Sequence, residues 1–472
     1  MRPKCDKAAS CEPLLNQRPS NGEIDIMEIE KDSGKIAKTL RVMILDKPGY
    51  LGKLTSAIGM QGSNIGDIRL VRMGLTHNTR EMTIYVDSEE QMEGILDNLA
   101  KVEGIIVEDV IDLVHQLHEG GKIAMKGRLP LNSIGDIRKI YTPGVAAICR
   151  DIQKKPELAY KYTAIPNQVA IVTNGTAILG LGDIGAVAGM PVMEGKAALF
   201  DRLVGVSGIP ILIESKDPAV IIETIKNIAT TFGAIKLEDI AAPECFEIED
   251  VLDKALDIPV MHDDQHGTAV VVLAALLNAT KFSGLMLSKS AIGVIGLGAA
   301  GMGISKLLLS YGVKKVIGTD LNQAACERLV AAGGESGTLL DVMEGANIVI
   351  ATTGCPKLIK PSMVKKGQVI LALSNPNPEI TPEDAVKAGA AFAADGKSVN
   401  NALGFPGIFR GALNARARTI NNKMKIAAAK AIAICAEEGE LVPSILNDEV
   451  HQKVAEAVER AALESGVIKP WE

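Results

Sequence analysis

The chain has 472 residues, enough for two to four domains, and its net charge of −7 argues against a general binder of nucleic acid or anionic membranes. Its start lacks the apolar segment of a signal peptide, and its longest apolar run, 269–277, is too short to span a bilayer. Seven cysteines without CxxC spacing indicate free thiols, so we expect a cytoplasmic protein.

Residues 1–36 are polar and are predicted to form a flexible lead-in. Residues 37–117 predict a strand, a helix, two strands, a helix and a strand, the βαββαβ order of ferredoxin-like α+β domains. The turn DKPGYL at 46–51 and the segment GSNI at 62–65 resemble the ACT regulatory domain. That resemblance implies a site for an amino-acid effector, and a module used only for assembly is the open alternative.

Residues 118–280 predict a second, α/β domain, because strands alternate with helices and imply a mainly parallel sheet. The expected strands are 169–173, 177–181, 210–214, 234–238 and 258–261. The segment GLGDIG at 180–185 fits the GxGxxG pattern, but Met190-Pro191 follows too soon for the helix of a dinucleotide fold. We therefore expect a glycine loop that shapes the wall of an active site.

Two acidic pairs in this domain each follow an apolar strand. Glu238 and Asp239 end the segment AIKLED, while Asp263 and Asp264 end the strand that precedes a helix expected to begin after Gly267-Thr268. In open α/β folds, ligands bind where the strands end. Carboxylates gathered there repel each other unless a cation lies between them, and Mg²⁺ or Mn²⁺ prefers such oxygen ligands.

Each acidic pair alone also fits a solvated loop or a helix cap. His262 and His266 flank the second pair at i, i+4 spacing, which raises the alternative of a zinc site. The zinc-protease pattern needs Glu after the first His on a continuous helix. Here Asp263 follows, and Gly267 is expected to start a new element, so zinc is disfavoured.

Residues 281–440 predict a doubly wound parallel-sheet domain that binds NAD. Strand, GLGAAG, helix and a second strand ending in Asp320 form the dinucleotide fingerprint in its required context. The predicted cofactor contacts are Gly296, Leu297, Gly298, Ala299, Ala300, Gly301 and Asp320. Asp320 can accept bonds from a ribose hydroxyl, and no cation follows it in Leu321-Asn322-Gln323, so NAD is favoured over NADP.

Further strands at 347–352, 368–373 and 391–394 complete this sheet. The chain from Met424 onward, including a tail at 441–472, predicts helices that pack back across the domains.

A nicotinamide site beside a metal site predicts a substrate that loses hydride while the metal holds its oxygen, as a 2-hydroxy acid would. A second carboxylate β to the new carbonyl would then leave easily as CO₂. The reaction needs a base for the hydroxyl and an acid for the enolate carbon. Lys196 and Tyr141 are the candidates, although a solvated lysine and a tyrosine packed in a turn are the simpler alternatives.

From Gly121 to about Glu440 the chain resembles the malic enzymes in their shorter bacterial and archaeal form. The matching segments are IYTPGVAAIC, VTNGTAILGLGDIGAVAGMPVMEGKAALF, LEDIAAPECFEIE, MHDDQHGTAVVVLAALLNA, GLGAAG, LSNPNPEI and NNALGFPGIFRGAL. The resemblance implies oxidative decarboxylation of (S)-malate to pyruvate and CO₂ with NAD and Mn²⁺ or Mg²⁺.

The resemblance also implies a role for each matching residue. Tyr141 corresponds to the acid that protonates enolpyruvate, Lys196 to the base for the C2 hydroxyl, and Asp263 to its orienting partner. The remaining residues implied are the metal ligands Glu238, Asp239 and Asp264, and the amides Asn375 and Asn401 that hold the substrate carboxylate and the nicotinamide ribose. Ala177 replaces an Arg of the larger malic enzymes, so here the substrate carboxylate must be held otherwise.

Two alternatives stay open. A malolactic enzyme, or an enzyme for another 2-hydroxy acid, would share nearly all these motifs and differ in its product. An inactive metabolite sensor is disfavoured, because a dead site has no need for clustered, mutually repelling acids. We expect a homo-oligomer, a dimer or higher.

Overall fold

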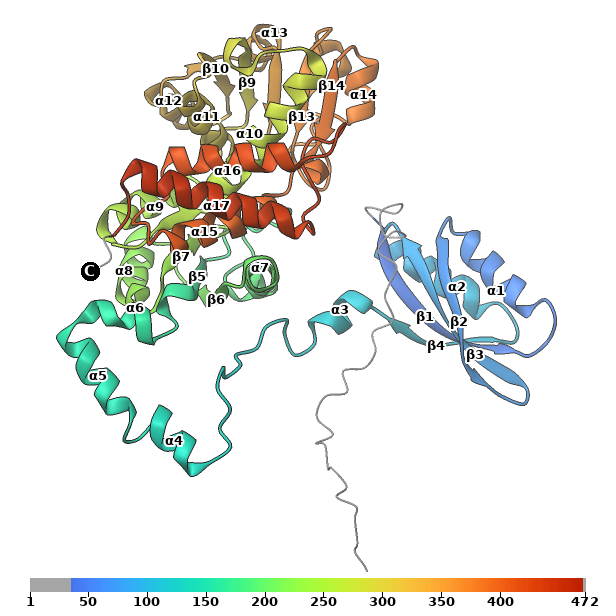
Figure 1. Ribbon diagram of the computed structural model, residues 1–472. Helices are drawn as coiled ribbons and strands as arrows, with labels where there is room; N and C mark the ends of the chain where they lie inside the picture. Colours follow the sequence, from blue (N-terminus) through green and yellow to red (C-terminus); the bar gives the residue numbers. More distant parts are fainter. Residues whose placement is uncertain (1–34, 470–472) are drawn as a thin grey trace, which may run out of the picture. The chain divides into compact units, whose positions relative to one another are not determined.

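The computed structural model describes residues 35–469, so the predicted lead-in lies almost entirely outside the described residues. The chain separates into two compact units at Gly120–Gly121 (Figure 1). Within the described residues, no helix is both long and apolar enough to cross a membrane.

The first unit is an antiparallel four-stranded sheet with two helices. Its elements are β1 (Ile36–Leu45), α1 (Tyr50–Gly59), β2 (Asn64–Met73), β3 (His77–Val86), α2 (Glu89–Ala100) and β4 (Ile105–Ile111). The strand order is β2-β3-β1-β4, and every second residue of β1 from Leu40 to Ile44 is buried in a core shared with α1 and α2. This confirms the predicted βαββαβ arrangement. A short helix, α3 (Leu113–His118), follows.

The second unit begins with helices and a parallel sheet in the order β6-β5-β7-β8. The strands are β5 (Gln168–Thr173), β6 (Ser207–Leu212), β7 (Ala234–Leu237) and β8 (Val260–His262). The helices are α4 (Ile134–Ile140), α5 (Val145–Lys154), α6 (Ala159–Tyr162), α7 (Met190–Val204), α8 (Pro218–Ile228) and α9 (Glu244–Ala255).

One predicted strand of this sheet is wrong. Residues 177–181 contribute only an isolated bridge between Ile178 and Gly182. Gly180 and Gly182 both adopt positive φ, so the chain turns tightly there instead of extending. The GLGDIG segment is accordingly a loop, as predicted, and Met190-Pro191 opens α7 because proline is well tolerated in a first helical turn.

Helix α10 (Asp263–Ser283) leads from this sheet into the next domain. The prediction that the helix begins after Gly267-Thr268 is wrong, because Asp263 and Asp264 already form its first turn. Acidic side chains are favourable there, since they face the positive end of the helix dipole. Most of α10 is buried, so it packs on several sides at once.

The third sheet is fully parallel and has the order β11-β10-β9-β12-β13-β14. Its strands are β9 (Ala291–Ile295), β10 (Lys315–Thr319), β11 (Glu335–Ser336), β12 (Ile348–Ala351), β13 (Val369–Ala372) and β14 (Phe392–Asp395). The helices are α11 (Ala299–Tyr311), α12 (Gln323–Ala331), α13 (Leu339–Gly345) and α14 (Pro382–Lys387). This is the 3-2-1-4-5-6 order of doubly wound dinucleotide folds.

Three helices close the chain: α15 (Phe405–Asn414), α16 (Asn422–Cys435) and α17 (Asp448–Ser465). Helix α17 packs on α15 and α16 and reaches α7, while α16 packs on α10 (Figure 1). The C-terminal helices therefore return to the first parallel sheet of this unit, which agrees with the predicted packing across domains.

Candidate active site

The two acidic pairs meet at the carboxyl edge of the sheet β6-β5-β7-β8. Glu238 and Asp239 follow β7, and Asp263 and Asp264 follow β8. Asp239 adopts a φ of 53°, a strained conformation for a residue with a side chain, and its N–H donates to Asp264 Oδ2 at 2.9 Å. The strained turn therefore ties one acidic pair to the other.

Three of these carboxylates can share one cation. Oxygens of Glu238, Asp239 and Asp264 all lie within 4.8 Å of one another. Asp239 Oδ2 is buried without a hydrogen-bond partner. Burial and the neighbouring Asp264 carboxylate raise the pKa of Asp239 to about 7. Buried, unsatisfied carboxylate oxygens fit a hard divalent cation such as Mg²⁺ or Mn²⁺.

Lys196, in the second turn of α7, reaches the same edge. Its Nζ lies 2.9 Å from Asp263 Oδ2, 2.9 Å from Glu238 Oε1 and 3.2 Å from Asn401 Oδ1. The structure thus brings together a lysine, its predicted carboxylate partner and one predicted amide. The Lys196 side chain keeps 13% of its surface exposed, whereas Asp263 exposes none.

A second lysine was missed by sequence reasoning. Lys236 on β7 is fully buried; its Nζ lies 2.9 Å from Asp263 Oδ2 and also pairs with Glu238. Both lysine amines lie over the ring of Phe405, at 4.6 Å for Lys236 and 4.9 Å for Lys196. Side chains alternate along a strand, so Lys236 shares a face with Glu238, and that spacing was the available signal.

Asp263 is the acceptor common to both lysines. Its complete burial would by itself raise the pKa, but the charges of Lys196 and Lys236 outweigh burial and hold the pKa of Asp263 below its usual range. Asp263 is therefore ionised and can fix the position of Lys196.

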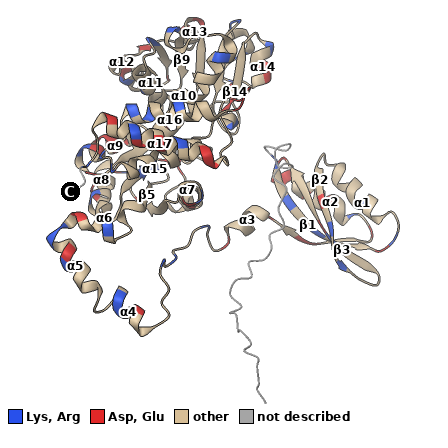
Figure 2. Ribbon diagram, in the orientation of Figure 1, with Lys and Arg blue, Asp and Glu red and all other residues tan. Residues whose placement is uncertain are grey.

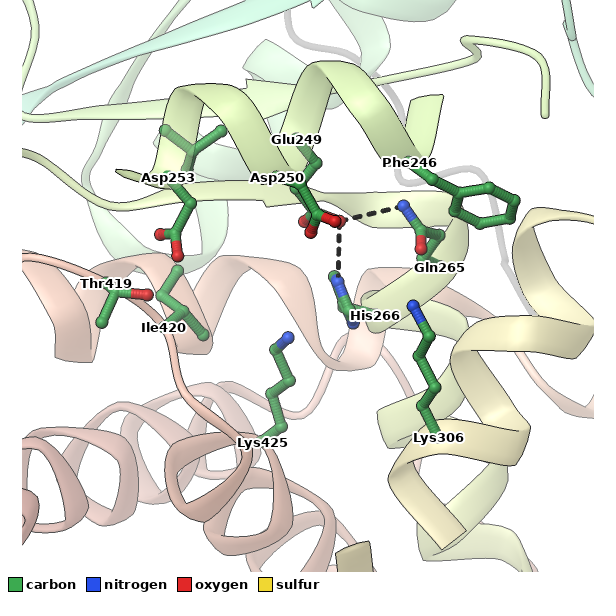
Figure 3. Close-up of a pocket in the computed structure, with 11 residues that line it drawn as sticks. Phe246, Glu249, Asp250, Asp253, Gln265, His266, Lys306, Thr419, Ile420 and Lys425 are labelled. Carbon is green, nitrogen blue, oxygen red and sulfur yellow. Dashed lines mark hydrogen bonds and ion pairs between the residues drawn. The ribbon is translucent and has the colours of Figure 1, made fainter. Parts of the chain in front are cut away.

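The start of α10 is held from behind by Glu249 on α9. Its carboxylate accepts from Gln265 Nε2 at 2.9 Å and from His266 Nε2 at 3.0 Å (Figure 3). It also accepts from His262 N–H at 2.7 Å. His266 thus points away from the acidic edge. Among the described residues, the group that could hold a metal ion consists of three carboxylates, and His262 Nε2 lies 3.5 Å from one of them, Asp264 Oδ2. Gly267, however, lies inside α10, so the prediction that it starts a new element is wrong.

Tyr141 is the predicted site residue that the structure does not bring to Lys196. It caps the C-terminus of α4 and is 68% exposed. No residue between 121 and 168 is buried, so the part of the chain that carries Tyr141 contributes no buried side chain to the core. The role of Tyr141 as the acid therefore stays a prediction.

The predicted dinucleotide loop joins β9 to α11. Gly296 has a φ of 89° and passes so close to Thr352 that a Cβ would lie 2.8 Å from its carbonyl oxygen. A Cβ on Gly301 would collide with the Gly296 carbonyl oxygen. Gly298 caps α11, and Leu297, Ala299 and Ala300 complete the turn at a helix N-terminus suited to a pyrophosphate.

Asp320 follows β10 and also shapes this loop. Its carboxylate accepts from Leu297 N–H at 2.6 Å and from Asn322 N–H at 2.8 Å. Its predicted contact with the cofactor ribose would add to this anchoring of the glycine loop.

The two predicted amides occupy different places. Asn401 begins a short 3₁₀ turn, Asn401–Leu403, and contacts Lys196. Asn375 follows β13, and a Cβ on Gly180 would lie 3.9 Å from its carbonyl oxygen. The GLGDIG loop therefore lies close to the loop after β13, and its role as a wall of the active site stays a prediction.

Comparison with known proteins matches two family models, the malic enzyme N-terminal domain at residues 130–253 and the malic enzyme NAD binding domain at 265–344 and 329–463. The chain belongs to the malic enzyme family. NAD-dependent malic enzyme 1 of Bacillus subtilis is 55% identical over 428 residues, which cover 90% of this chain and 98% of that protein.

Two further malic enzyme relatives are informative. The bifunctional malic/malolactic enzyme of Bacillus subtilis is 43% identical and aligns over 75% of this chain and 93% of its own. The crystal structure of malic enzyme from Pyrococcus horikoshii is 42% identical and superposes with a TM-score of 0.70, covering 75% of this chain and 89% of that one. The parallel-sheet fold is thus that of malic enzymes.

Gly267→Ala is expected to lower kcat/KM on the order of a hundredfold. A Cβ at Gly267 would collide with Asp263 Oδ1, and that carboxylate cannot yield easily because two lysines hold it. Steady-state kinetics checks this. Gly195→Ala is the matched control, since Gly195 also lies in a helix beside the site but has open space for a Cβ. Equal kinetics for the two variants would contradict the expected displacement of Asp263.

Proposed function

We propose that this chain oxidatively decarboxylates malate to pyruvate and CO₂ and reduces NAD, with Mg²⁺ or Mn²⁺ as a cofactor. The observation that carries the proposal is the meeting of three metal-binding carboxylates with the Lys196–Asp263 pair at one sheet edge. The named activity of the 55% identical relative supports the same reaction.

The chain's own residues supply the proton chemistry. Glu238, Asp239 and Asp264 would hold the cation, which supplies Lewis-acid polarisation of the substrate oxygen when bound. Lys196 in its neutral form accepts the proton of the C2 hydroxyl, and Asp263 keeps its amine directed into the site. Asn401 orients the same amine without adding charge.

The experiment is an assay of malate-dependent NAD reduction with Mn²⁺ that also quantifies pyruvate and lactate. NADH matched by pyruvate, and its loss with a chelator, is the expected result. Lactate without net NADH would favour the malolactic alternative. No turnover with any 2-hydroxy acid would overturn the proposed reaction.

NAD is proposed as the cofactor over NADP because Asp320 would repel a 2′-phosphate. Asp320→Ser is expected to raise the ratio of kcat/KM for NADP to that for NAD by about tenfold or more. Asp320→Asn is the companion variant and should shift the ratio in the same direction, because it removes the charge while its amide oxygen can still accept from one of the two N–H groups of Leu297 and Asn322. If neither variant moves the ratio in kinetic assays, cofactor choice lies elsewhere.

We also infer that the chain acts as a homo-oligomer in which Tyr141 is the acid. Residues 121–168 contain no buried residue, although the segment displays large apolar side chains. These are Met125, Leu129, Leu131, Ile134, Ile137, Ile140, Tyr141 and Tyr162. Both signs of charge accompany them on α4 and α5 (Figure 2). A second copy would cover this surface and could receive Tyr141 at its own Lys196.

The first unit is proposed to be an ACT-like regulatory or assembly domain. Its ferredoxin-like sheet and its turn at Gly49 support this assignment. A panel of amino acids added to the malate assay tests the regulatory role, and unchanged kinetics would leave assembly as its role. The described cysteines, all free, support the proposed cytoplasmic location.

A further inference from the structure

Lys236 is a fully buried lysine with two carboxylate partners and no exposed surface. Lysine is rarely buried completely unless it is paired. Its partners are Glu238, a proposed metal ligand, and Asp263, the partner of Lys196. Lys236 therefore lies between the cation site and the base.

The burial of the two lysines separates their roles. Lys196 keeps 13% of its side chain exposed, whereas Lys236 exposes none. A small substrate can reach only the first of them. Lys236 must therefore act through its neighbours, as a positioning residue.

Both oxygens of Glu238 are held by lysines. Lys196 lies 2.9 Å from Oε1, and Lys236 pairs with Oε2. A cation bound through Glu238 must compete with these ammonium groups for the same oxygens. Asp263 Oδ2, 2.9 Å from Lys236, offers that lysine a second partner once Glu238 turns to the cation.

The charges of the carboxylates and lysines at this edge are consistent with a cation replacing a lysine as the partner of Glu238. Four carboxylates, Glu238, Asp239, Asp263 and Asp264, face two lysines, so two negative charges lack a partner when all groups are ionised. One divalent cation neutralises them. Removing a lysine without its carboxylate would leave an excess of negative charge, which attracts the cation more strongly.

We propose that Lys236 is a positioning residue that competes with the divalent cation for Glu238 and holds Asp263 in place once the cation is bound. This rests on the proposed function, since it requires the cation site. Lys236 thereby lowers the affinity of the site for the cation. It also holds Asp263 in position, and Asp263 in turn positions Lys196.

The test measures Mn²⁺ affinity without substrate, by the electron paramagnetic resonance signal of free Mn²⁺, together with kcat. Lys236→Met keeps the apolar stem and removes the charge. We expect it to bind Mn²⁺ about tenfold more tightly while kcat falls about a hundredfold. A purely structural role would weaken both. Unchanged or weaker Mn²⁺ binding in the folded variant would overturn the proposal.

A charge-balanced variant separates the effect of the lost charge from the effect of misfolding. Lys236→Met combined with Asp263→Asn removes one charge of each sign, so the excess of two negative charges is the same as in the wild-type site. Its Mn²⁺ affinity is expected to return to within about threefold of the wild-type value. Affinity as tight as in Lys236→Met alone would contradict the charge argument. Absence of Mn²⁺ binding in the wild-type chain would instead refute the cation site, and with it the proposed function.

Discussion

Replacing Lys196 with methionine is expected to lower kcat for malate oxidation by about a thousandfold or more and to leave NAD affinity unchanged. Without the amine, the site loses the group that accepts the C2 hydroxyl proton. Methionine retains a stem of similar length that can pack against Phe405, and Asp263 keeps Lys236 as a partner. The fold and the distant glycine loop should therefore be intact.

Steady-state kinetics and NADH fluorescence titration check the two halves of this expectation. Lys226→Met on α8 is the control, because Lys226 is a solvated lysine whose ion-pair partner is Glu223, one helical turn away. Such surface pairs contribute little to stability. Near-normal turnover of Lys196→Met would remove Lys196 as the base, and lost NADH binding would indicate that the variant is misfolded.

The sequence predicted best those parts of the candidate site that depend on a few neighbouring residues. The glycine loop at 296–301 needs residues without Cβ because Gly296 and Gly301 approach other backbone atoms, and this requirement is visible as spacing. The acidic pairs were equally visible, since both follow apolar strands. Parallel strands bring their carboxyl ends together, so Glu238 and Asp263 could be expected to meet, whereas the pairing of Lys196 with Asp263 was implied only by the family resemblance.

Features fixed by tertiary contacts were missed. The sequence predicts a helix break at Gly267, yet this residue lies inside α10. It is a glycine there because Asp263 leaves no room for a Cβ. In the sequence, Lys236 is a single charged residue within an apolar strand. Only the structure shows that it pairs with two carboxylates. Strand β11 has only two residues, both polar, and therefore carries no hydrophobic pattern.

The position of Tyr141 could not be predicted, because a local motif does not specify which copy of the chain receives the side chain. The sequence around Tyr141 indicates a turn, and the structure adds the helices α4 and α5 on either side of it. The exposed apolar side chains of residues 121–168 indicate a surface that a partner covers, and the sequence does not identify that partner. Mixing two inactive variants can identify that surface.

Tyr141→Phe is expected to lower kcat on the order of a hundredfold, since the phenol that protonates the enolate carbon is lost. Co-expression of Tyr141→Phe with Lys196→Met is then expected to restore activity. If each site takes Lys196 from one chain and Tyr141 from its partner, every mixed dimer has one intact site. With equal, random mixing, half of the dimers are mixed, so about a quarter of wild-type activity should return.

The matched control co-expresses Lys196→Met with Asp264→Asn. The structure places both residues at one edge within the same chain, joined through Glu238, so each mixed dimer keeps one defect in either site. No recovery is expected from that pair. Recovery in the Tyr141 mixture alone would show that the tyrosine crosses between subunits. A silent mixture, despite an inactive Tyr141→Phe, would mean that the segment around α4 folds onto its own chain during catalysis.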